Sequence, residues 1–107
     1  MDKKRRYGVF SIEVKDAVIV TVNIRFVTIH HAHEILTQLK NIMDEHDKNL
    51  MLNLENVESL DSTTISMLVE LNHYLKESGK VLMLENLTPF VKKTFEMLHI
   101  TKFFNIE

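Results

Sequence analysis

The sequence predicts a single α/β domain with a mixed β-sheet and with helices packed mainly on one face of that sheet. An alternation of apolar and polar residues near the start predicts two antiparallel strands. Further on, apolar residues at spacings of three and four predict three helices, with short apolar runs between them. The expected order is β-β-α-β-α-β-α-β, in which strands separated by a helix run parallel through right-handed crossovers.

Length and composition limit the class of protein. The chain has 107 residues, of which 45% are hydrophobic and 26% charged, so we expect one compact domain over residues 1–107. The absence of cysteine excludes disulfides, thiolate metal sites and cysteine nucleophiles. A net charge of -2 gives no general attraction to nucleic acid, and no apolar run approaches the roughly 18 residues that span a membrane. We therefore expect a cytoplasmic protein without direct nucleic-acid binding or membrane insertion.

The first third of the chain is expected to form a hairpin. Residues 1–7 contain the basic run Lys3–Arg6 and are interpreted as a charged tail or lead-in. From Phe10 to Val14, and again from Val18 to Ile24, apolar side chains alternate with polar ones around a turn at residues 15–16. This period of two predicts a β-hairpin.

Two helices and a strand follow the hairpin. The first helix is expected from about His31 to Glu45, and a short strand from Leu50 to Leu54. A second helix opens in a run of hydroxyl residues and reaches about Ser78, before Gly79. Its apolar residues cover more than half of its circumference, so it should contact more than one surface. We expect it between the first and third helices on one sheet face, the alternative being an exposed docking patch.

The last part of the chain adds a strand, a helix and an edge strand. The strand is expected over residues 80–85, and the third helix begins where Thr88 provides a cap and Pro89 the first helical position. A final strand is expected over residues 103–106. The predicted core contains Val20, Val22, Ile35, Leu39, Leu52, Leu54, Leu68, Leu82, Leu84 and Phe95.

Catalytic and metal-binding patterns are weak in this sequence. His30, His31 and His33 lie close together, but no acidic or thiolate cluster joins them, so we predict no functional metal and no cofactor. Ser62 is not part of a Gly-x-Ser-x-Gly elbow. The two glycines of the chain are far apart, whereas a phosphate-binding loop has several glycines close together. We therefore predict a protein that is not an enzyme.

The hydroxyl run at the second helix has two interpretations. Asp61, Ser62, Thr63, Thr64 and Ser66 are residue types that cap a helix start, where the first amides lack partners. The second interpretation is a switch, because the Ser62 hydroxyl is expected to be accessible at the junction of loop and helix. A phosphate of about -1.5 to -2 charge is tolerated there and changes any surface that packs over it. We expect a partner to bind these five residues, and a kinase to phosphorylate Ser62 in preference to the other hydroxyls.

The chain resembles a STAS domain of the bacterial anti-sigma-factor antagonist type. The resemblance covers nearly the whole chain and rests on the order of elements and on the segments at 52–64 and 85–104. In that family an Asp-Ser-Ser/Thr-Gly motif begins the second helix, and its first hydroxyl residue is phosphorylated. Ser62 matches that residue and Asp61 the acid, whereas Thr64 replaces the glycine, and His99 a frequent glycine after the third helix.

The resemblance implies partner switching by a protein that we expect to be a monomer. The unphosphorylated protein would bind an anti-sigma factor with serine-kinase activity and so free a sigma factor. Phosphorylation of Ser62 would end that binding, and a serine phosphatase would reset the switch. The alternative is a STAS scaffold that is not phosphorylated, or an accessory subunit, in a stress-signalling complex or a lipid-transport ATPase.

Overall fold

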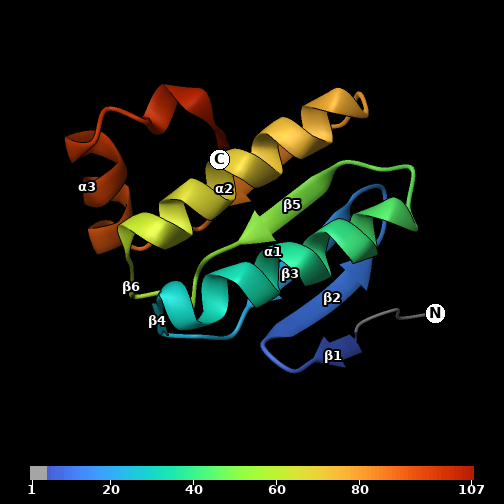
Figure 1. Cartoon of the computed structure of the whole chain (residues 1–107), viewed down its shortest axis with the longest axis horizontal. Helices are drawn as coiled ribbons and strands as arrows, with labels where there is room; N and C mark the ends of the chain where they lie inside the picture. The colour runs from blue at the N-terminus through green and yellow to red at the C-terminus, as the bar shows by residue number, and fades with distance from the viewer. Residues whose placement is uncertain (1–4) are drawn as a thin grey trace.

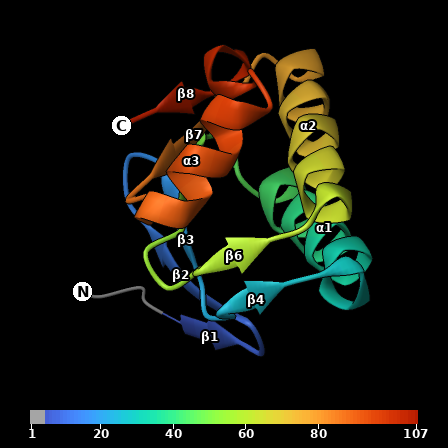
Figure 2. The same ribbon diagram turned by 90° about the vertical axis from the view of Figure 1, so that its left-hand side faces the viewer.

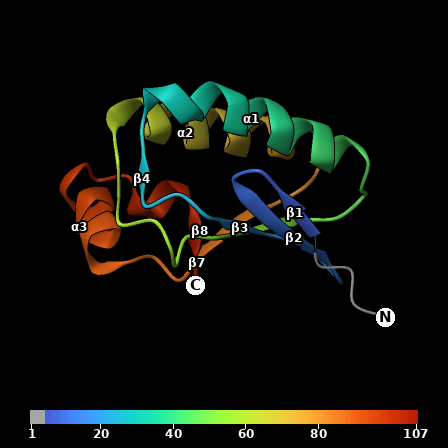
Figure 3. The same ribbon diagram turned by 90° about the horizontal axis from the view of Figure 1, so that it is seen from below.

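The computed structural model describes the backbone of residues 5–107 and the side chains of residues 8–107. In this part of the chain, α1 and α2 lie side by side over one face of a mixed sheet, and α3 lies at one end of that sheet (Figures 1 and 3). The elements are β1 (Arg5–Tyr7), β2 (Phe10–Val14), β3 (Val18–Val22), β4 (Phe26–Val27), α1 (Ile29–Asp44), β5 (Leu50–Asn53), β6 (Ser59–Leu60), α2 (Ser62–Glu77), β7 (Leu82–Glu85), α3 (Pro89–Met97), the 3₁₀ turn η1 (Thr101–Phe103) and β8 (Asn105–Ile106).

The main sheet has the strand order β1-β2-β3-β5-β7-β8. The first three strands are antiparallel, and β3, β5, β7 and β8 are parallel. The predicted mixed sheet, with a hairpin followed by parallel strands, is therefore confirmed. The hairpin ends at Val22 rather than Ile24, because the chain leaves the sheet there to form β4.

The hydrophobic core lies between the sheet and the pair of helices α1 and α2. All ten residues predicted for the core are buried, which confirms that prediction. Leu68 contributes to it from α2 and is 1% exposed, and Phe95 contributes from α3 and is fully buried. The rings of Phe95 and Phe104 lie 5.5 Å apart, so the segment after α3 joins the core.

The first helix begins two residues earlier than predicted, because Thr28 caps it. The Thr28 hydroxyl accepts a hydrogen bond from the His30 amide at 3.3 Å, and the Thr28 amide donates to His31 Nδ1 at 3.2 Å. Threonine before an apolar helical pattern is a recognised start signal. His31 therefore has a capping role, and no metal-binding group of three His, Cys, Asp or Glu residues occurs within the described part of the chain.

The placement of α2 corrects one expectation. Its neighbour on the side away from α1 is η1 rather than α3, since the Asn72 side chain donates a hydrogen bond to the Phe103 carbonyl at 3.0 Å. The third helix has only nine residues and lies at the end of the sheet. Val69, an apolar residue of α2, is 48% exposed and lines the same hollow as Asn72 and Phe103.

Two features of the fold were not predicted. Arg5–Tyr7 pairs with β2, so the lead-in joins the sheet from Arg5 onward, and residues 1–4 lie outside the described range. In addition, β4 and β6 form a separate parallel pair. Each of these strands has two or three residues, too few for an alternating pattern to show. Among the described helices, none combines the length and the apolar character needed to cross a membrane.

Candidate functional site

The parallel pair β4–β6 places the start of α2 beside the start of α1. Figure 2 shows β4 leading into α1 and β6 leading into α2, at the same end of the molecule. The strand β6 ends at Leu60, Asp61 follows in extended conformation, and Ser62 is the first helical residue. The side chain of Ser62 is exposed there, as the sequence predicted for a hydroxyl at this junction.

The hydroxyl residues of this segment differ in exposure. Ser66 is exposed one turn after Ser62, and Thr63 is half-buried. Thr64, which was expected among the partner-binding residues, is only 3% exposed. The helical rotation between successive residues accounts for this difference, since Thr64 and Ile65 turn toward the core.

Asp61 caps α2 and also contacts α1. Its Oδ1 atom accepts hydrogen bonds from the Thr64 amide at 2.9 Å and from the Thr64 hydroxyl at 2.8 Å. Its Oδ2 atom accepts a hydrogen bond from the Ile29 amide at 2.9 Å. One carboxylate therefore joins the N-termini of two helices.

These hydrogen bonds hold the pKa of Asp61 below its ordinary value, with the Thr64 amide as the largest cause. A lowered pKa in the folded state means that the ionised carboxylate stabilises the fold. This contribution is complete above the ordinary pKa and is lost as the pH falls through the lowered one.

Thr64 occupies the position of the motif glycine and uses its hydroxyl internally. The oxygen lies 2.8 Å from Asp61 Oδ1 and 3.2 Å from the Val27 carbonyl, and its single proton can serve one of these acceptors at a time. The side chain thus connects the start of α2 with β4. A glycine here would leave both acceptors without this donor.

Replacing Thr64 with valine is expected to lower the free energy of unfolding by about 1 to 2 kcal/mol. Valine keeps the shape of the side chain but removes a buried hydroxyl whose acceptors include a carboxylate. Urea unfolding measures this change. Thr63→Val is the matched control, since Thr63 is half-buried and makes no hydrogen bond through its side chain within the described residues; an equal loss there would contradict the assigned role.

An apolar rim lies beside the start of α2, and it was not predicted from the sequence. Phe26 is 51% exposed and Ile29 is 60% exposed, at the end of β4 and the start of α1. The Arg25 guanidinium lies 5.2 Å from the centre of the Phe26 ring and 2.6 Å from the Glu58 carboxylate. The Arg25–Glu58 contact joins two segments that are distant in sequence, so no local pattern indicated it.

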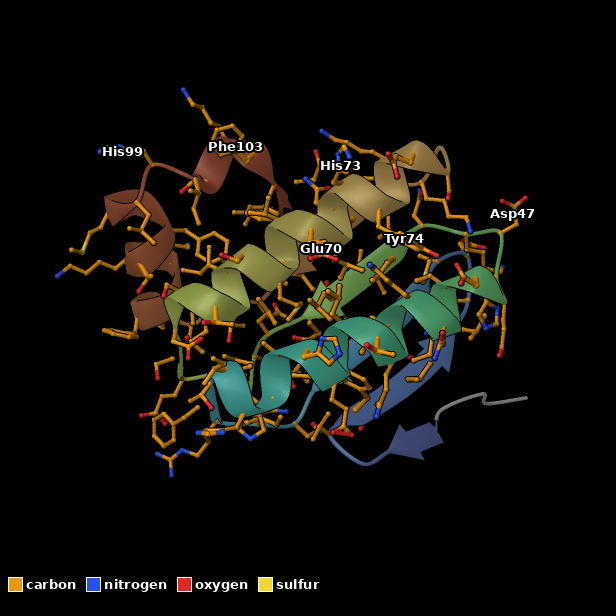
Figure 4. The ribbon with its side chains drawn as sticks, in the orientation of Figure 1. Asp47, Glu70, His73, Tyr74, His99 and Phe103 are labelled. Atoms are coloured by element: carbon orange, nitrogen blue, oxygen red, sulfur yellow. The ribbon has the colours of Figure 1, made fainter. Side chains whose placement is uncertain are left out.

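Polar contacts join α1 and α2, and Figure 4 labels the two α2 residues that make them, Glu70 and Tyr74. Lys40 Nζ lies 3.0 Å from the Glu70 carboxylate and 4.7 Å from the centre of the Tyr74 ring. The Tyr74 hydroxyl donates to Asp44 at 2.7 Å, and this acceptor raises the pKa of Tyr74. These residues lie in later turns of α1 and α2 and take no part in the contacts around Asp61 and Ser62.

The fold and the site together define a single-domain α/β protein with an exposed serine at the start of its central helix. The family model of the STAS domain matches residues 10–107. The chain therefore belongs to the STAS domain family. No curated protein sequence matches it.

Several solved structures have the same fold. TM1081 from Thermotoga maritima aligns with a TM-score of 0.81 and 21% identity, covering 96% of this chain and 82% of the other. An anti-sigma-factor antagonist (STAS) domain protein from Planctomyces limnophilus aligns with a TM-score of 0.80 and 17% identity, covering 91% and 87%. The Bacillus cell fate determinant SpoIIAA, in its phosphorylated form, aligns with a TM-score of 0.67 and 15% identity, covering 92% and 90%. At these identities the likeness shows the fold.

Proposed function

We propose that this protein is a cytoplasmic anti-sigma-factor antagonist that acts by partner switching and is not itself an enzyme. When unphosphorylated, it binds an anti-sigma factor with serine-kinase activity, and phosphorylation of Ser62 releases it. The observation that carries this proposal is the exposed Ser62 hydroxyl directly after the cap Asp61, at the motif position of the family. SpoIIAA, an anti-sigma factor antagonist of the same fold, has been solved in both phosphorylated and unphosphorylated forms.

The surface around Ser62 suits a partner that is released when a phosphate adds negative charge to this surface. Phe26 and Ile29 supply exposed apolar area, and Ser66 and Thr63 supply polar contacts on α2. The nearby Arg25 is paired with Glu58, which leaves the rim close to neutral. A phosphate on Ser62 adds about -1.5 to -2 charge next to the ionised Asp61, so a partner packed there meets both repulsion and a desolvation cost.

Ser62→Asp is expected to weaken partner binding about a hundredfold and to leave the melting temperature almost unchanged. Ser62→Ala is expected to bind constitutively and to resist phosphorylation. Because Ser62 is exposed and Asp61 supplies the cap, neither substitution removes a structural contact. Isothermal titration with the purified kinase measures the binding, and mass spectrometry after incubation with ATP locates the phosphate.

Ser78→Asp is the matched control, since it places the same charge on an exposed serine at the other end of α2. We expect it to weaken binding much less than Ser62→Asp. Phosphate on another residue, or equal binding by Ser62→Asp and the wild type, would contradict the switch.

A constitutive scaffold or accessory subunit of a stress-signalling complex or a lipid-transport ATPase is the second candidate. It is favoured by Thr64 in place of the motif glycine, because the motif that a kinase would recognise departs there from the family pattern. The genes beside this one distinguish the two candidates. A gene for a small histidine-kinase-like ATPase would support the switch, and genes for a transporter ATPase and permease would support the scaffold. The switch also requires a serine phosphatase.

A further inference from the structure

The Asp61 side chain accepts hydrogen bonds beyond the one that capping requires. A helix cap needs one side-chain oxygen, and Asp61 Oδ1 fulfils this role for α2. The first helix has a cap of its own in Thr28. The bond from the Ile29 amide to Asp61 Oδ2 therefore adds a link between the two helices, across 32 residues of sequence.

This hydrogen bond joins the two parts of the surface around Ser62, which are the start of α2 and the segment from β4 to the start of α1. Ser62 follows Asp61 in the chain, and Ile29, with its exposed side chain, is held by Asp61 through its amide. Phe26 lies on β4 opposite Ser59 of β6, two residues before Asp61. The positive ends of α1 and α2 meet at this carboxylate, which is why an ionised acid is stable there.

We propose that Asp61 is a positioning residue that couples Ser62 to the start of α1, so that phosphorylation of Ser62 alters the Phe26–Ile29 surface as well as α2. This inference rests on the proposed role of Ser62. The phosphate is attached to the residue next to Asp61, and its charge repels the carboxylate. It is also attracted to the same two helix N-termini that the carboxylate neutralises. Both effects weaken the hydrogen bond between the Ile29 amide and Asp61 Oδ2, and the start of α1 is thereby loosened.

The test uses phosphoserine incorporated at position 62 of the full chain during synthesis, so it needs no kinase. We expect the Ile29 amide resonance to shift upfield and its exchange with water to become about fivefold faster, as for the loss of one hydrogen bond. Asp61→Ser is expected to change the Ile29 amide in the same way without phosphate. Its hydroxyl still caps α2 but is too short to reach α1. Phosphoserine at position 66 is the matched control and should leave the Ile29 amide unchanged.

The outcomes separate the two proposals. An Ile29 amide that is unchanged by phosphoserine 62, while the Thr63 and Thr64 amides shift, would overturn the coupling. The same holds if phosphoserine 66 has an equal effect, since the response would then be general electrostatics. The experiment with phosphoserine at position 62 changes no other residue, so it remains decisive if the Asp61→Ser variant folds poorly. A kinase that ignores Ser62 would refute the proposed switch and leave the measured coupling intact.

Discussion

Replacement of Phe95 with alanine is expected to lower the free energy of unfolding by about 3 to 5 kcal/mol, the largest effect of any change considered. Phe95 is fully buried, and its ring packs 5.5 Å from that of Phe104. The substitution removes apolar surface from the core and leaves a cavity that the short α3 and η1 cannot close. Since domains are stable by only about 5 to 15 kcal/mol, this is a large share of the total. Urea unfolding followed by circular dichroism measures it.

Phe103→Ala is the matched control for Phe95. The two rings belong to neighbouring segments, but Phe103 is 60% exposed, so its removal is expected to change the free energy of unfolding by less than about 0.5 kcal/mol. A loss for Phe95→Ala that is no larger than this would mean that α3 does not dock on the core as described.

Leu68→Ala is expected to cost about 2 to 5 kcal/mol, the second-largest effect. Leu68 is 1% exposed and contributes to the core from the middle of α2, where the helix continues on both sides of it. Because the same helix carries Ser62, a shift of its axis would also be felt at the site. Urea unfolding gives the stability, and the m-value shows whether the unfolding remains two-state.

The neighbouring Val69 provides the control for Leu68. It lies about 100° further round α2 and is 48% exposed, so Val69→Ala is expected to change the free energy of unfolding by less than about 0.5 kcal/mol. If Leu68→Ala moved the unfolding free energy by less than about half a kcal/mol, the orientation of α2 would be wrong.

The parts of the fold that were predictable from sequence have long periodic patterns. The second helix was predicted almost to the residue, because its apolar positions extend over four turns and Gly79, with φ of 73°, ends it. The ten core residues were predictable for the same reason. The strands β4 and β6 were not, since two residues carry no period and their pairing depends on where β3 and β5 end.

The exposure of Ser62 was predictable from the sequence, but the contacts around it were not. The exposure of Ser62 follows from a local rule about helix starts, whereas the bond from Ile29 to Asp61 and the burial of Thr64 depend on how two distant segments meet. His99 is a similar case. Its φ of 57° lies in the left-handed region, which explains why a glycine is frequent there in the family that the sequence resembles.

The strand order has a consequence for how the chain is made. Along the main sheet, every described strand pairs with the strand that precedes it in that sheet, and no later strand is inserted between earlier ones. A chain that emerges from the ribosome can therefore add each strand to an edge that is already present, after α1 and then α2 have covered it. No pair of strands that has already formed must separate so that a later strand can insert between them. The number of residues between paired strands also stays small. We expect the nascent hairpin β2–β3 and α1 to become resistant to protease before β7 has been synthesised.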